Sequence, residues 1–196
     1  MGVDRAPESP YCGRIYTTDA TGWPGYHASE GIVLYVFDAA LNPITNSTGG
    51  KKFTGGITYG TDDISRVVVS DDGRVFLSRF SPTTVSPVVE VNPGDLNANF
   101  KDVFTSIKGK TIGIDVKGAG ENLKLVMLST TNRTSTEYDL GTATQWTSST
   151  PSRTYIKTDK TTGKALSLVT DNAYISYDLN DGVWLTQHRA TASATE

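Results

Sequence analysis

Residues 73–78 read Gly73-Arg74-Val75-Phe76-Leu77-Ser78, a glycine followed by a short, mainly apolar run. Similar phrases begin at residues 13, 122 and 182, so successive copies are 60, 49 and 60 residues apart. The other copies are Gly13-Arg14-Ile15-Tyr16-Thr17-Thr18, Asn122-Leu123-Lys124-Leu125-Val126-Met127-Leu128 and Gly182-Val183-Trp184-Leu185-Thr186. Repeats of about 40 to 50 residues built from short strands are typical of β-propeller blades. The spacing therefore predicts an all-β fold of repeated four-stranded units.

The second unit shows the pattern most fully. A strand at 66–70 leads into Asp71-Asp72-Gly73, and an Asp-Gly turn between apolar runs is a strong hairpin signal. Further strands are expected at 74–79, 87–91 and 102–104 in this unit, at 112–116, 123–129, 136–140 and 153–156 in the third, and at 173–177 and 183–187 in the fourth. The first unit has strands at 14–18, 33–38 and near 52–53, with no convincing innermost strand before them.

The strand count predicts an incomplete ring. We place the units at 11–57, 64–107, 111–158 and 165–196 of one segment, 1–196, and they hold three, four, four and two strands. A propeller closes with about four or more four-stranded blades. We therefore expect a partial β-propeller of three to four antiparallel blades, incomplete at the C-terminus and completed by the remainder of a longer protein or by a second copy. Residues 1–10 and 189–196 are expected to be loosely held.

Composition excludes several function classes. The net charge is -3, from 18 basic and 21 acidic residues. The sequence has no stripe of Lys and Arg with interleaved aromatics, so we do not expect nucleic acid binding. No apolar run approaches 18 residues, so we expect no membrane span. No signal peptide is recognisable either, and if the protein is secreted we expect its signal upstream of this chain.

The catalytic inventory is small. His27 and His188 are the only histidines, Cys12 is the only cysteine, and none of the three lies in a metal-ligand spacing. We expect Cys12 to be a small buried thiol. No Gly-x-Ser-x-Gly phrase marks a nucleophile. Neither a metal nor a cofactor is predicted.

Calcium is the alternative for the acidic pairs. Oxygen ligands are available at Asp62-Asp63, at Asp71-Asp72 and at Asp178 with Asp181. Two of these three pairs sit on Asp-Gly turns, where Asp is favoured for its hydrogen bonds to the backbone. We therefore favour structural turns over calcium sites.

Aromatic and polar residues in loops are the predicted ligand-binding residues. Trp23, Tyr26 and His27 lie in a Gly- and Pro-bounded insertion of the first unit, where they could stack on a sugar ring, form a peptide hot spot, or fold back over the core. His188 and Arg189 follow the last strand, at a loop end. Trp184, in the middle of that strand, is expected in the core.

Two phrases carry a resemblance to a known group. Residues 3–16 with residues 31–39, and later residues 180–189, resemble propeller domains in secreted or surface proteins of gut Bacteroidetes. NHL-like and lactonase-like propellers are similar at the level of the fold. The resemblance implies an extracellular or cell-surface location and glycan or protein binding.

Two functions follow as hypotheses. The first is a noncatalytic extracellular binding or scaffolding module for carbohydrate or protein ligands, which the absence of a nucleophile or metal pattern favours. The alternative is a propeller hydrolase or lyase acting on a sugar or lactone, with a site completed by blades outside this chain. Fold alone does not decide between them.

Overall fold

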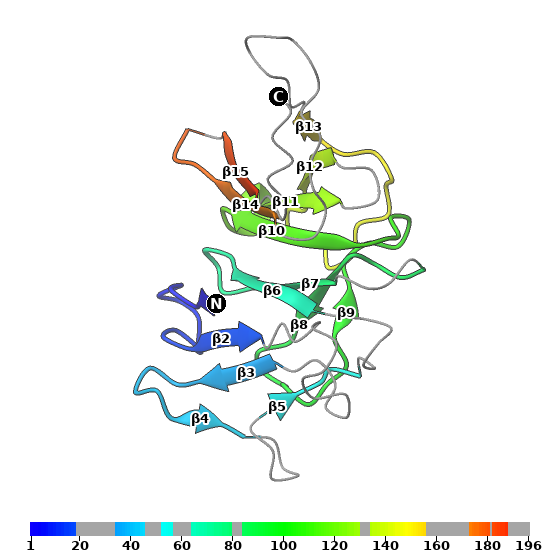
Figure 1. Ribbon diagram of the computed structural model, residues 1–196. Coiled ribbons are helices and arrows are strands. Elements are labelled where there is room, and N and C mark those ends of the chain that lie inside the picture. Colours follow the sequence, from blue (N-terminus) through cyan, green and yellow to red (C-terminus); the bar gives the residue numbers. More distant parts are fainter. Residues whose placement is uncertain are drawn as a thin grey trace, which may run out of the picture.

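The computed structural model describes residues 1–18, 34–45, 52–56, 64–79, 84–129, 134–155, 173–180 and 182–187. Within these residues every regular element is a β-strand, apart from one turn of 3-10 helix, Gly120–Asn122. The strands form four antiparallel sheets that follow one another along the sequence (Figure 1). The prediction of an all-β fold with repeated antiparallel sheets is thus confirmed. None of the helical structure in this part of the chain is long and apolar enough to cross a bilayer.

The first sheet has five strands, ordered β1-β2-β3-β4, with β5 also paired to β3. They are β1 (Gly2–Val3), β2 (Ile15–Thr18), β3 (Leu34–Phe37), β4 (Pro43–Ile44) and β5 (Lys52–Phe53). The expectation that this unit lacks an innermost strand is wrong, because β1 pairs with β2 through Gly2 opposite Tyr16. Two residues are too few to show an alternating pattern, so this strand has no recognisable signature in the sequence.

The N-terminal segment is also more ordered than expected. The carboxylate of Asp4 is buried, and it accepts hydrogen bonds from the Ala6 N–H at 3.0 Å and from the Ser9 hydroxyl at 2.6 Å. The backbone of Asp4 also pairs with Arg14 and Gly13. These bonds fold residues 4–14 into a compact turn that seats β1 on β2.

The second and third sheets each have four strands in sequence order. They are β6 (Ile64–Val69), β7 (Val75–Arg79), β8 (Val88–Val91) and β9 (Lys101–Asp102), and then β10 (Thr111–Lys117), β11 (Lys124–Ser129), β12 (Thr134–Asp139) and β13 (Arg153–Tyr155). The last sheet is the hairpin of β14 (Ala173–Tyr177) and β15 (Val183–Gln187). All ten of these strands were predicted, most of them with ends shifted by one or two residues.

The turn between β6 and β7 shows why the phrase begins with glycine. Gly73 has a φ of 83°, and a Cβ at this position would lie 3.0 Å from the Ser9 hydroxyl oxygen. The neighbouring carboxylates reach the next sheet: Asp71 accepts the Gly118 N–H at 3.1 Å and Asp72 accepts the Gly120 N–H at 2.8 Å. The turn interpretation of this acidic pair is therefore confirmed.

The sheets pack face to face through alternating side chains. Between the first and second sheets lie eleven buried residues: Tyr16, Leu34, Val36, Phe53, Val67, Val75, Leu77, Val89, Val91, Leu96 and Phe100. Between the second and third lie ten: Phe76, Val88, Val103, Phe104, Ile114, Leu123, Leu125, Met127, Tyr138 and Leu140. Between the third and fourth, the buried apolar residues in the described part of the chain are Val126, Leu128 and Ile175. Because neighbours along a strand point to opposite faces, β7 and β11 each serve two of these layers.

One edge of this stack is formed by the first strands of the later sheets. β6 contacts both β2 and β10, and β10 contacts β14 (Figure 1). We call the surface along β6, β10 and β14 the leading edge. Residues far apart in the sequence meet there.

Candidate functional site

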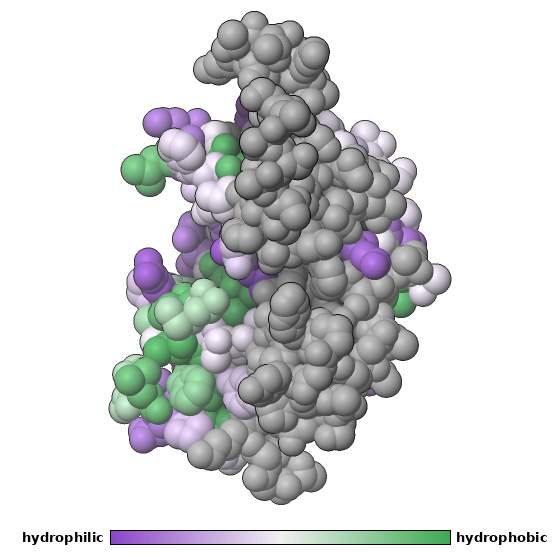
Figure 2. Space-filling view, viewed as in Figure 1, coloured by the Kyte–Doolittle hydropathy of each residue, from purple (hydrophilic) through white to green (hydrophobic). Residues whose placement is uncertain are grey.

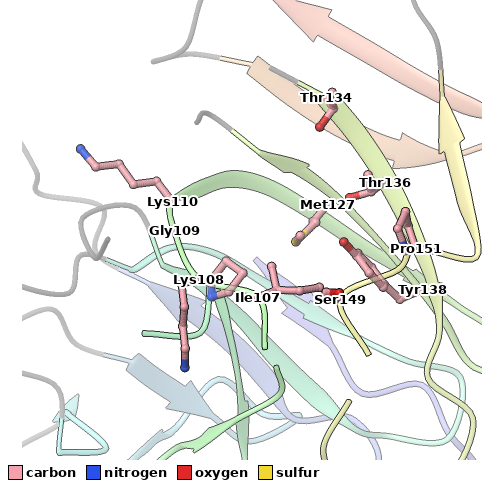
Figure 3. A pocket seen from close by; sticks show the side chains of 11 residues that line it. Ile107, Lys108, Gly109, Lys110, Met127, Thr134, Thr136, Tyr138, Ser149 and Pro151 are labelled. Carbon is pink, nitrogen blue, oxygen red and sulfur yellow. The ribbon is translucent and has the colours of Figure 1, made fainter. Parts of the chain in front are cut away.

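A hollow that is partly open to solvent lies where the second and third sheets meet. Its volume is about 190 Å³, and we call it the hydroxyl cleft. The side chains that face it come from β11, β12 and two loops, and include Met127, Thr134, Thr136, Tyr138, Ser149 and Pro151 (Figure 3). Pockets for drug-sized ligands are usually about 300–1,000 Å³. The cleft therefore fits a small molecule or one unit of a longer ligand.

A rigid aromatic cluster backs the cleft. The Tyr138 ring meets Phe104 edge to face, with the centroids 4.8 Å apart, and meets Trp146 in the same manner at 6.2 Å. The backbone of Trp146 forms a parallel bridge with that of Phe104, in which the backbone N–H of Trp146 donates to the Val103 carbonyl at 2.6 Å. This bridge fixes the loop after β12 to the second sheet. The cleft wall is thus set by backbone hydrogen bonds as well as by packing.

Polar groups in and behind the cleft have unused hydrogen-bonding capacity. Thr136 Oγ1 and Trp146 Nε1 are buried and have no hydrogen-bond partner in the described part of the chain. Burial raises the pKa of Tyr138. A buried hydroxyl without a partner carries a desolvation cost of about 1–3 kcal/mol, which a bound ligand can recover.

The lining is uncharged on its inner side. Figure 3 shows the ammonium groups of Lys108 and Lys110 directed away from the hollow. Among the described residues that line it, none carries a carboxylate, an imidazole or a thiol. The arrangement suits neutral hydrogen-bonding groups of a ligand.

The leading edge carries a second set of polar residues. The guanidinium of Arg66 on β6 lies 4.4 Å from the ring centroid of Tyr174 on β14. Between them, Asp115 on β10 accepts the Ser176 hydroxyl and the Tyr177 N–H, each at 2.8 Å. Burial lowers the pKa of Arg66, and Tyr174 and Asp115 oppose that effect.

A buried carboxylate joins the third and fourth sheets. Glu137 on β12 accepts hydrogen bonds from the phenols of Tyr155 at 2.7 Å and Tyr177 at 3.0 Å, and Lys124 lies 3.7 Å away. Burial and the Glu137 carboxylate raise the pKa of Tyr155 to about 12, and the same two causes raise that of Tyr177. We interpret the cluster as structural, because each phenol serves to solvate the carboxylate. The sequence pattern did not mark Glu137 as a functional residue. The alternation of side chains along β12 does place it on the same face as Ser135.

A more open hollow of about 460 Å³ lies beside the N-terminal turn. Pro7, Pro10, Tyr11 and Pro93 line it together with the turn at Asp71. The hydrogen bonds that Asp71 makes to the next sheet leave this hollow without a free carboxylate at that position. We base no function on it.

The predicted ligand-binding residues, Trp23, Tyr26, His27, His188 and Arg189, lie outside the described residues. Among the acidic pairs, Asp62, Asp63 and Asp181 lie outside them too, while Asp178 caps its turn by accepting the Asn180 and Gly182 N–H groups at 2.7 Å. In the described part of the chain no three His, Cys, Asp or Glu side chains gather to hold a metal ion.

Two expectations about burial are wrong. Trp184 is 71% exposed, because the inner face of the last hairpin is filled by Ile175, Val183 and Leu185 and alternation places Trp184 on the other face. Cys12 is exposed as well, because it lies in the turn before β2 and not on the strand. Trp146, left without a prediction, is half-buried against the second apolar layer.

Comparisons with protein-family models, with curated proteins and with solved structures found no match.

Proposed function

We propose that this chain is a segment of a β-propeller that serves as a noncatalytic binding module, with the hydroxyl cleft as its site for a carbohydrate unit. The observation that carries the proposal is the cleft itself, a small hollow whose described lining includes threonine, serine and tyrosine hydroxyls and holds no carboxylate or imidazole. Sugar hydroxyls both donate and accept hydrogen bonds, as these side chains do. A cavity of about 190 Å³ favours a sugar unit over a folded protein surface.

The propeller arrangement is supported by the way the sheets stack. Each sheet after the first packs on the one before it, and the first strands lie side by side along the leading edge. Both end faces of the stack carry aromatic groups, with Tyr35 and Phe37 half-buried on the first sheet and Trp184 exposed on the last. Figure 2 shows hydrophobic surface over the first sheet. Such faces would be covered by further blades or by a second copy.

A location outside the cell is part of the same proposal. The resemblance of residues 3–16 and 180–189 to surface propellers supports it, and so does a binding site of the kind that recognises glycans. The predicted loop residues Trp23 and Tyr26 remain candidates for additional contacts to the same ligand.

The test is binding to a glycan array by the unmodified chain, Thr136→Val and a matched control. We expect Thr136→Val to weaken binding at least tenfold while its unfolding free energy stays the same or rises, because the lost hydroxyl has no hydrogen-bond partner among the described residues. Thr144→Val, at an exposed position beyond the cleft, should bind as the unmodified chain does. Retention of no glycan at all, or equal binding by Thr136→Val, would overturn the assignment of the cleft.

A further inference from the structure

Arg66 is the strongest unexplained cation in the described part of the molecule. Its Nη1 is buried and has no hydrogen-bond partner, although the side chain as a whole is only half-buried. The other arginines of the second sheet are paired, since Arg74 binds both oxygens of Glu90 and Arg79 binds Asp102 at 2.8 Å. A buried charge without a counter-ion carries a desolvation cost in free energy, so binding of an anion at Arg66 would be favourable.

The protein's own nearby carboxylate does not supply that anion. Asp115 is the acidic group that acts on Arg66 electrostatically, but both of its oxygens are already engaged. One accepts the Val116 N–H at 3.0 Å, and the other accepts the Ser176 hydroxyl and the Tyr177 N–H. These bonds direct Asp115 toward β14, and Arg66 Nη1 keeps no hydrogen-bond partner among the described residues.

The surroundings hold the guanidinium in place for a ligand. Tyr174 lies under it at 4.4 Å, and this ring is itself 55% exposed. Stacking on an aromatic ring leaves the in-plane N–H groups of a guanidinium available, and two parallel N–H groups match the two oxygens of a carboxylate. The exposed Ser176 lies on the same face of β14 as Tyr174.

We propose that Arg66, stacked on Tyr174 at the leading edge, is a binding site for the carboxylate of a small acidic ligand, separate from the hydroxyl cleft. The site is assembled from three sheets, because Arg66 comes from β6, Asp115 from β10 and Tyr174 from β14. In the proposed propeller this edge faces the centre of the ring, where an acidic ligand can be reached by several blades. The carboxylate site does not depend on sugar binding in the cleft.

Three probes separate the carboxylate from its carrier. Sodium acetate supplies the carboxylate alone, sodium glucuronate supplies it on a sugar, and glucose supplies the sugar without it. Each is titrated into the unmodified chain at constant ionic strength, adjusted with sodium chloride, and the Arg66 Nε–H resonance is followed by NMR. We expect acetate and glucuronate to shift this resonance in a saturable manner and glucose to leave it unchanged.

Variants then assign the site. Arg66→Gln should weaken glucuronate binding at least tenfold. The affinity of Arg66→Lys should lie between those of Arg66→Gln and the unmodified chain, because lysine keeps the charge but loses the planar pair of donors. Arg5→Gln, at an exposed position, is the matched control and should bind normally. The thermal midpoint of the unmodified chain should rise with glucuronate, as it does for any ligand that binds only the folded state, and that of Arg66→Gln should not.

Several outcomes would overturn the proposal. An Arg66 resonance that does not respond to either carboxylate would do so without any variant, as would an equal response to sodium chloride alone. Equal glucuronate binding by Arg66→Gln would place the anion elsewhere. Failure of Thr136→Val to affect glycan binding would count only against the hydroxyl cleft, so the two proposals fail separately.

Discussion

The two interfaces of the third sheet are built on different principles. The interface with the second sheet holds ten buried side chains in the described residues, including Phe104, and this apolar layer contains an aromatic cluster. The interface with the fourth sheet holds three in the described residues, and the layer is completed by Glu137 with the phenols of Tyr155 and Tyr177. The first interface is stabilised mainly by removal of apolar surface from water, and the second depends on a hydrogen-bonded charge.

This difference has an energetic consequence. Full burial of a large apolar side chain contributes about 1.5–3 kcal/mol, so an interface with ten of them is stable without exact polar geometry. A buried carboxylate with all of its hydrogen bonds made contributes little net stability. When it is removed, the buried groups that bonded to it lose their partner, and the unfolding free energy falls. We therefore expect the stability of the interface between the third and fourth sheets to depend more on pH than that of the interface between the second and third.

The largest expected effect is at the apolar interface. Phe104→Ala should lower the unfolding free energy by about 3–5 kcal/mol, because the side chain is fully buried. Leu185→Ala, half-buried against the last apolar layer, should cost only about 1–2 kcal/mol. Urea denaturation monitored by fluorescence measures both, and Leu179→Ala, 97% exposed, is the control with no expected effect. A larger loss for Leu185→Ala than for Phe104→Ala would reverse the comparison.

The next effect concerns the charge at the other interface. Glu137→Ala should lower the unfolding free energy by about 2–3 kcal/mol, because two phenols lose their acceptor. Glu137→Gln should cost less, since its amide oxygen still accepts. Glu121→Ala, at an exposed position, is the control and should change stability by less than about 0.5 kcal/mol. If Glu137→Ala is as stable as the unmodified chain, the cluster does not hold the sheets together.

The phenols predict loss of stability in alkali. The pKa of Tyr155 rises in the folded protein from 10.0 to about 12, and that of Tyr177 rises as well. A raised pKa means that the folded state favours the neutral phenol, so this stability is fully present below about pH 10 and is lost as the pH rises toward 12. The unfolding free energy should fall across that interval, and less steeply in the double variant Tyr155→Phe with Tyr177→Phe.

Ultraviolet absorbance of the phenolate gives an independent check. Tyr155 and Tyr177 should ionise late and together with unfolding, as should Tyr16 and Tyr138, because burial raises the pKa of all four phenols. Ionisation of every tyrosine near pH 10 while the fold stays intact would show that the cluster is open to water.

The strands were more predictable than the sites. The phrase at 73–78 and its copies predicted ten of the strands because hairpin sheets alternate and end at turns such as Asp72-Gly73. The strand β1 gave no pattern because it is two residues long. Trp184 was misplaced because alternation alone does not tell which face of an end sheet has a neighbour.

The polar sites could not be predicted for a different reason. The Arg66 pair with Tyr174 joins residues more than 100 positions apart, and the Glu137 cluster draws phenols from β13 and β14. Such contacts depend on how successive sheets stack, and a local sequence pattern does not carry that information. Thr136 has the sequence pattern of an ordinary strand residue. It lines a cleft because the loop that contains Trp146 bridges to Phe104 and contributes Ser149 and Pro151 to the lining.

The smallest expected effect on stability is at Trp184, on the outer face of the last hairpin. Trp184→Ser should change the unfolding free energy of the dilute chain by less than about 0.5 kcal/mol, because the side chain is 71% exposed. Its effect on assembly should be larger. If a second copy or a further blade covers this face, the unmodified chain should self-associate as its concentration rises, through an interface above about 1,000 Å², and Trp184→Ser should remain monomeric. Size-exclusion chromatography with light scattering measures both. A monomer at every concentration for both proteins would show that the outer face of this sheet needs no cover, and it would remove one support of the propeller proposal while leaving the two ligand sites untouched.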